Sequence, residues 1–181
     1  MPRLFTGISL PDPIKHRLHL LCQGLPNARW VDEDDLHLTL RFIGDVEASD
    51  AEEIATALTQ IKHAPFQLVL EGLGVFGGRK PRTIWADIRS CGSLNALQLA
   101  QENLISGLGF PPEQRKFVPH ITLARLKTGT KPDRVAAYME TNGFFADLSF
   151  SVEAFALFSA RPGRGGGPYV VEQEYVLDAG R

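Results

Sequence analysis

One short pattern occurs twice in this chain, and its repetition constrains the fold more than any other feature. His37-Leu-Thr-Leu and His120-Ile-Thr-Leu lie 83 residues apart (120 − 37). The same step carries Phe66, the start of an apolar strand-like run, to Ser149 in another such run. A motif and a strand that repeat with one spacing predict a duplicated structural unit.

Each half of the chain shows the same order of expected elements, β-α-β-α-β. Strands are predicted from β-favouring apolar runs and helices from apolar residues at helical spacing. In the first half we expect strands over 4–10, 36–42 and 66–75, a helix from residue 12, and a helix over 49–61 whose N-terminal capping box joins Ser49 and Glu52. In the second half we expect strands over 83–88, 117–126, 148–158 and 169–177, and helices over 93–108 and 133–139.

These elements predict an α+β fold. We expect a single bilobal domain over 1–181, with pseudo-repeat lobes at about 1–80 and 81–181. The duplicated β-α-β-α-β units would place two antiparallel sheets face to face across a central cleft, with the helices outside. The glycine-rich stretch 161–168 is expected to be a mobile loop.

Composition limits the classes of function. Hydrophobic residues make up 44% and charged residues 22% of the 181 residues, which is typical of a globular protein. No apolar run approaches the roughly 20 residues that span a bilayer, and the N-terminal residues lack a secretory apolar region, so we expect a cytoplasmic protein without membrane contact. The net charge of −2 argues against coating nucleic acid by bulk charge, but allows a local grip on one phosphate.

The sequence gives no pattern for a metal or cofactor. Cys22 and Cys91 are far apart, which argues against a disulfide framework or zinc site. The acidic run 32–35 lacks spaced glycine or histidine ligands, so we interpret it as a solvated turn. We therefore expect the protein to act without metal or cofactor. His16, His19 and His63 belong to no comparable pattern and are expected to be structural or exposed.

The paired motifs carry chemistry that suits an acid and a base. Residues two apart on a strand share one face, so His37 projects with Thr39, and His120 projects with Thr122. An imidazole can give or take a proton near neutral pH, and a threonine hydroxyl can donate to a phosphate oxygen. Two such units on opposite sides of a phosphorus atom suit an in-line displacement.

The segments 36–44 and 117–125, with the opening Arg3-Leu-Phe-Thr-Gly-Ile and the closing Gly-Gly-Pro-Tyr169, resemble the two-histidine phosphoesterase superfamily. The chain is most similar to the RNA 2′,3′-cyclic phosphodiesterases of bacteria and archaea, also known as 2′-5′ RNA ligases. This resemblance implies hydrolysis of a terminal 2′,3′-cyclic phosphate to a 2′-phosphate, with His120 activating water and His37 protonating the departing O3′. A pseudo-symmetric site leaves open which histidine is the acid.

The resemblance also implies that Phe42 and Arg125, each five residues after a histidine, flank the terminal base. Arg125 could contact the phosphate instead. Strict alternation puts both side chains on the face opposite the histidines, so a strand end or a bulge must bring them round.

Several functions remain open from the sequence. The hydrolase would act on an RNA 3′ end or a cyclic nucleotide, not on DNA, and we expect a monomer. The alternatives are a 2′-5′ ligase for tRNA halves, an esterase for cyclic nucleotides or ADP-ribose cyclic phosphate, and a non-catalytic RNA-end binder.

Overall fold

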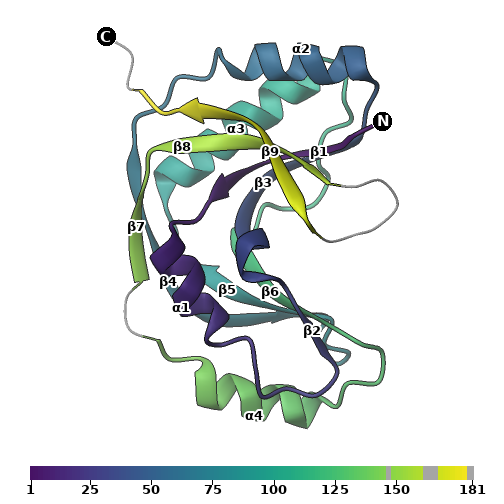
Figure 1. Cartoon of the computed structure of the whole chain (residues 1–181), viewed down its shortest axis with the longest axis vertical. Coiled ribbons are helices and arrows are strands. Elements are labelled where there is room, and N and C mark those ends of the chain that lie inside the picture. The colour runs from purple at the N-terminus through teal and green to yellow at the C-terminus, as the bar shows by residue number, and fades with distance from the viewer. Residues whose placement is uncertain (146–147, 161–166, 179–181) are drawn as a thin grey trace.

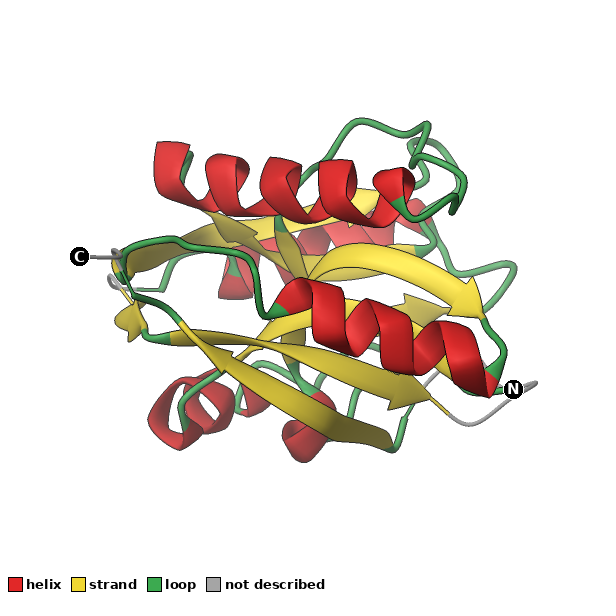
Figure 2. Cartoon of the chain, turned by 90° about the horizontal axis from the view of Figure 1, so that it is seen from above, coloured by secondary structure: helices red, strands yellow, loops and turns green. Residues whose placement is uncertain are grey.

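The fold consists of two antiparallel sheets with helices around them (Figures 1 and 2). The computed structural model describes residues 1–145, 148–160 and 167–178. The first sheet has the order β3-β1-β8-β9 and the second has the order β2-β6-β5-β4-β7. The strands are β1 Arg3–Ser9, β2 Ala28–Trp30, β3 His37–Asp45, β4 Phe66–Phe76, β5 Thr83–Ile88, β6 His120–Leu126, β7 Leu148–Val152, β8 Ala154–Ala160 and β9 Tyr169–Val176. The helices are α1 Asp12–His19, α2 Ala48–Leu58, α3 Gly92–Gly107 and α4 Pro132–Asn142, with a 3₁₀ turn η1 at Glu33–Asp35.

The predicted α+β class with two antiparallel sheets is confirmed, and three local predictions are wrong. The expected strand 148–158 is interrupted at Glu153, so that β7 belongs to the second sheet and β8 to the first. The expected capping box is absent, because α2 begins one residue before Ser49 and Glu47 is its N-cap residue. The strand expected from residue 117 begins only at His120. The short strand β2 and the turn η1 were not predicted.

The two halves of the chain exchange their third strands. Strand β8, from the second half, pairs with β1 of the first half, and β4 pairs with β5 of the second. The first residues of β4 also pair with β7, in a register that places Leu68 opposite Phe150. The sheet order β3-β1-β8 is thus repeated as β6-β5-β4, which is the arrangement that a duplicated unit produces.

The helices lie outside the strands and close the core. In Figure 1, α2 and α3 lie beside the first sheet at the top, and α4 lies below the second sheet. The main core includes Ile54 and Leu58 of α2 and Leu94 and Leu97 of α3, all fully buried. The hydroxyl of Tyr138 on α4 donates to the carbonyl of Leu21, just beyond α1, at 2.5 Å.

The glycine-rich loop expected at 161–168 lies outside the described residues, except for Gly167 and Pro168. None of the described helices is long and apolar enough to cross a membrane.

Candidate active site

A cavity of about 440 Å³ lies between the two sheets and contains both motifs. Strand β3 of the first sheet contacts β6 of the second, which brings His37 and His120 to opposite walls. The structure places all six residues singled out from the sequence in this cavity: His37, Thr39, Phe42, His120, Thr122 and Arg125.

A β-bulge in each motif strand explains how Phe42 and Arg125 reach the cavity. Two consecutive residues of β1 pair with Thr39 and Arg41, so β3 has one residue more than its partner at this point. In the same way, two consecutive residues of β5 pair with Thr122 and Ala124 of β6. Each bulge reverses the alternation of the side chains that follow it. Phe42 is 46% exposed and Arg125 is exposed, on the same side as the histidines.

Both imidazole rings are oriented by the carbonyl of the residue two positions before them. Nδ1 of His37 lies 2.7 Å from the carbonyl oxygen of Asp35, and Nδ1 of His120 lies 2.7 Å from that of Val118. A carbonyl oxygen only accepts, so Nδ1 carries the proton in each ring. In the neutral rings Nε2 is therefore the atom that can accept a proton. In His37 this Nε2 lies 3.0 Å from the hydroxyl oxygen of Thr39, which donates to it.

Burial lowers the pKa of both histidines below the ordinary value, but their neighbours differ in charge. The carboxylate of Asp35 acts on His37 in the opposite direction and raises its pKa in part. The guanidinium of Arg125 lowers the pKa of His120 further. The ammonium group of Lys15 and the ring of His120 also lower the pKa of His37, so burial and nearby cations favour the neutral form of both rings.

Aromatic rings pack around each histidine, and at least one ring in each group comes from the other half of the chain. The ring centroid of His37 lies 5.7 Å from that of Phe158 on β8 and 4.8 Å from that of Tyr169 on β9. The centroid of His120 lies 5.0 Å from that of Phe76 on β4 and 5.7 Å from that of Trp85 on β5. These rings pack against the imidazoles and restrict their rotation.

The interpretation of the acidic run as a solvated turn is wrong at its last residue. Asp35 is only 9% exposed and lines the cavity. Its Oδ1 accepts the backbone N–H of Tyr169 at 2.9 Å, while its carbonyl holds His37. A Cβ added at Gly167 would overlap the same carboxylate, so a larger residue there would displace the side chain of Asp35. Asp35 thus joins the histidine motif to the start of β9.

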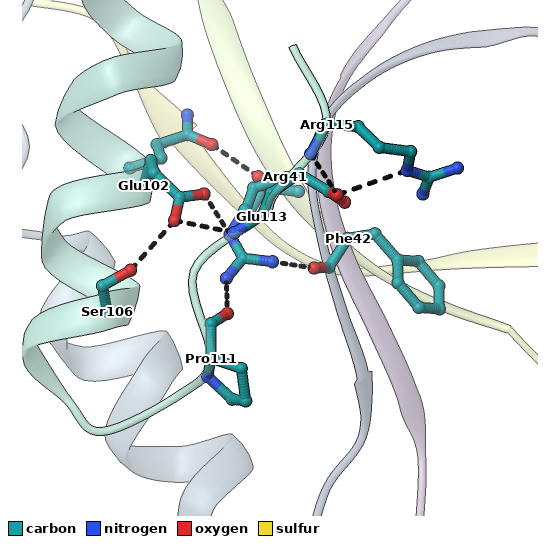
Figure 3. Close-up of polar contacts among 9 residues, drawn as sticks. Arg41, Phe42, Glu102, Ser106, Pro111, Glu113 and Arg115 are labelled. Carbon is teal, nitrogen blue, oxygen red and sulfur yellow. Dashed lines mark hydrogen bonds and ion pairs between the residues drawn. The ribbon is translucent and has the colours of Figure 1, made fainter. Parts of the chain in front are cut away.

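A buried ion pair supports the strand that carries the first motif (Figure 3). Arg41 is 5% exposed and its guanidinium pairs with Glu102 on α3. The same guanidinium donates to the carbonyl oxygens of Phe42 and Pro111. Glu102 also accepts the hydroxyl of Ser106 at 2.9 Å. The network fixes the bulged part of β3 against α3 and the segment that leads toward His120.

Sequence reasoning assigned no role to several residues of the cavity wall. Some of them follow no motif, and others lie in the opening and closing segments that resemble the superfamily. Of those, the chemically distinctive ones are Arg3, Phe5, Arg29, Trp30, Asp32, Asp35 and Tyr169. Pairing with β6 brings β2 to the cavity, and no local pattern could have predicted that pairing. The other histidines lie elsewhere: His16 and His19 are exposed and face Glu33, and His63 is half-buried against the ring of Phe66. Within the described parts of the chain, no group of three His, Cys, Asp or Glu side chains is arranged to hold a metal ion.

Comparison with known proteins gives concordant results. The family model described as the 2′-5′ RNA ligase superfamily matches residues 11–164. The RNA 2′,3′-cyclic phosphodiesterase of Geobacillus stearothermophilus is 37% identical over 75% of this chain, and the one of Aquifex aeolicus is 32% identical over 96% of this chain and 94% of its own length. The chain matches only 43% of the Geobacillus protein. The crystal structure of Escherichia coli LigT complexed with 3′-AMP superposes with a TM-score of 0.79 at 28% identity, covering 98% of this chain and 99% of that one.

Proposed function

The chain belongs to the 2′-5′ RNA ligase superfamily, and on that basis we propose that it hydrolyses a 2′,3′-cyclic phosphate at an RNA end to a 2′-phosphate. The Geobacillus and Aquifex relatives are named for this activity, and LigT was crystallised with a nucleotide. The observation that carries the proposal is the placement in one cavity of two histidines whose Nδ1 atoms are both held by backbone carbonyls. Nε2 is then the reacting nitrogen of each ring, and in His37 the hydroxyl of Thr39 lies against it.

The proposed reaction is an in-line displacement at phosphorus. Nε2 of neutral His120 takes a proton from a water molecule, whose oxygen forms a bond to phosphorus. The bond from phosphorus to O3′ breaks, and Nε2–H of protonated His37 gives its proton to O3′. The cation of Arg125 beside His120 favours the neutral base there, and the carboxylate of Asp35 offsets part of the effect of burial and of Lys15 on His37.

The remaining side chains would hold the substrate. The hydroxyls of Thr39 and Thr122 would donate to the non-bridging phosphate oxygens. The negative charge of the phosphate would favour the protonated form of His37 and so offset the effect of burial on its pKa. Phe42 and the plane of Arg125 would stack on the terminal base, a contact that every base can make.

The test is turnover of adenosine 2′,3′-cyclic phosphate and of an oligonucleotide with a cyclic-phosphate end, in EDTA, with the product read by phosphorus NMR. We expect a 2′-phosphate, and a fall in kcat of at least about 10²-fold in His37→Ala and in His120→Ala. His63→Ala, which removes a half-buried histidine outside the cavity, is the matched control and should keep its activity. Turnover at the wild-type rate in either cavity variant would exclude the two-histidine mechanism.

A further inference from the structure

We infer that Arg29, beside Arg125, forms a second phosphate subsite that binds the 5′-phosphate of the terminal nucleotide. This inference rests on the proposed function, because it assigns the cyclic phosphate to the two histidines. It specifies the substrate as an RNA end, or a nucleotide with a 5′-phosphate, in preference to a free cyclic nucleoside phosphate.

The two arginines are neighbours on adjacent strands. Arg29 on β2 lies directly opposite Arg125 on β6 in the antiparallel register. Both are exposed, and both line the cavity that contains the histidines. Directly opposed residues of an antiparallel pair project on the same face, and like charges in that arrangement destabilise the sheet. A bound anion between the two guanidinium groups would remove this repulsion.

In the described part of the chain, three other charged groups line the cavity wall, Arg3, Asp32 and Asp35, and none of the three forms an ion pair with these two arginines. Arg3 is held by Asp45 through two hydrogen bonds, of 3.0 and 2.7 Å. The carboxylate of Asp35 accepts the N–H of Tyr169. Among the described residues, no carboxylate forms an ion pair with Arg29 or Arg125. Two planar guanidinium groups side by side can each donate two parallel hydrogen bonds to a phosphate.

The position of Arg29 fits a phosphate that lies one nucleotide from the reacting one. Arg125 is three residues beyond Thr122 on β6, and Arg29 lies one strand farther across the sheet. With about 3.3 Å per residue and about 4.8 Å between strands, the Cα atoms of Arg29 and Thr122 are roughly 11 Å apart. A long side chain at this distance can reach a group on the far side of the terminal ribose.

The chemistry of the substrate explains why such a subsite would select RNA ends. A nucleoside 2′,3′-cyclic phosphate carries one phosphate, and its 5′ oxygen is a hydroxyl. At an RNA end, the 5′ oxygen of the same ribose carries the phosphodiester to the preceding nucleotide. The arginine pair would therefore bind a group that is present in the polynucleotide and absent from the free cyclic nucleoside phosphate.

A binding experiment tests this without requiring turnover. Calorimetry would compare adenosine 2′-phosphate with adenosine 2′,5′-bisphosphate on the wild type, Arg29→Ala and Arg17→Ala. A charge-assisted hydrogen bond contributes enough to predict about 10-fold tighter binding of the bisphosphate to the wild type. Arg29→Ala should abolish most of that ratio, while Arg17→Ala, which removes an exposed arginine of α1 outside the cavity, should retain it.

Kinetics provide a second readout. The ratio of kcat/KM for a cyclic-phosphate-ended dinucleotide to that for adenosine 2′,3′-cyclic phosphate should fall about 10-fold in Arg29→Ala, and Arg29→Lys should restore part of it. Equal binding of the two ligands by the wild type, or an unchanged ratio in Arg29→Ala, would overturn the subsite. An equal loss of these ratios in Arg17→Ala would also overturn the subsite, because it would indicate that positive charge on the surface in general, and not Arg29 in particular, attracts the additional phosphate. If no substrate is turned over, the proposed function fails, whereas the calorimetric comparison still decides the subsite.

Discussion

Replacing Arg41 by methionine should destabilise the protein far more than replacing an exposed arginine of the same sheet. Methionine fills similar space but supplies no charge and no donor. It would leave the carboxylate of Glu102 in a site where that residue is only 16% exposed, and would remove the donor to the carbonyls of Phe42 and Pro111. Glu102 would keep only its neutral partners, the hydroxyl of Ser106 and the backbone N–H of Glu113.

The expected loss can be estimated from these contacts. Removing one partner of a buried ion pair costs about 3–5 kcal/mol, because the remaining charge stays buried. For a chain of this length, 1 kcal/mol moves the thermal midpoint by about 2–4 °C, so the midpoint should fall by roughly 6–20 °C. The assay is urea and thermal unfolding, followed by circular dichroism and by tryptophan fluorescence.

Arg3→Met is the matched control. Arg3 lies on the neighbouring strand β1 and pairs with Asp45 at 2.7 Å, but the two side chains are 31% and 42% exposed. Solvent screens such a pair, so its loss should change stability much less. A second control combines Arg41→Met with Glu102→Gln, and this double variant should be more stable than the sum of the single changes predicts, since the unpaired carboxylate is gone. A loss in Arg41→Met no larger than that in Arg3→Met would refute the role given to the buried pair.

Three further predictions concern pH, packing and metal. Because burial lowers the pKa of His37 and of His120, the unfolded chain binds more protons than the folded one just below pH 6.5, so the free energy of unfolding should fall as the pH drops from 7.5 to 5. Urea titrations at both pH values check this, and a flat profile would contradict it. Gly74→Ala should lower kcat, because its Cβ would overlap the ring of Trp85, which contacts His120; Gly107→Ala has open space around its Cβ and should not, and equal rates in the two variants would exclude the effect. EDTA should leave turnover of a cyclic phosphate unchanged, and inhibition restored by a divalent ion would show a metal requirement.

The sequence predicted what depends on local periodicity and on repetition. Alternating apolar residues predicted both motif strands, and the repeated motif predicted that His37 and His120 meet in one site. The break at Glu153 was not predictable, because this residue takes an exposed position in the same alternation as Ser149 and Ser151 while the partner strand changes. Neither was the burial of Asp35, because its partner Tyr169 lies 134 residues away and its neighbours in sequence are acidic.

The two β-bulges show most clearly what the alternation of residues in the sequence could not predict. Each one leaves two consecutive buried residues, Leu40 and Arg41 in β3, and Leu123 and Ala124 in β6. The second pair is apolar and could have indicated a shift in alternation. The first contains an arginine, whose burial depends on Glu102 from a distant helix, so the pattern could not reveal it.

The exchange of third strands has a consequence for how such a site could be built. A chain with only one β-α-β-α-β unit would leave one edge of its sheet open, and its histidine would lack the aromatic ring that Phe158 or Phe76 supplies from the other half. Two copies could satisfy both needs by forming a twofold dimer in which each subunit lends its last strand to its partner. Joining the copies in one chain keeps that arrangement while removing its dependence on concentration. The same joining lets the two histidine sites diverge, so that Arg41 can stand in one motif where Ala124 stands in the other.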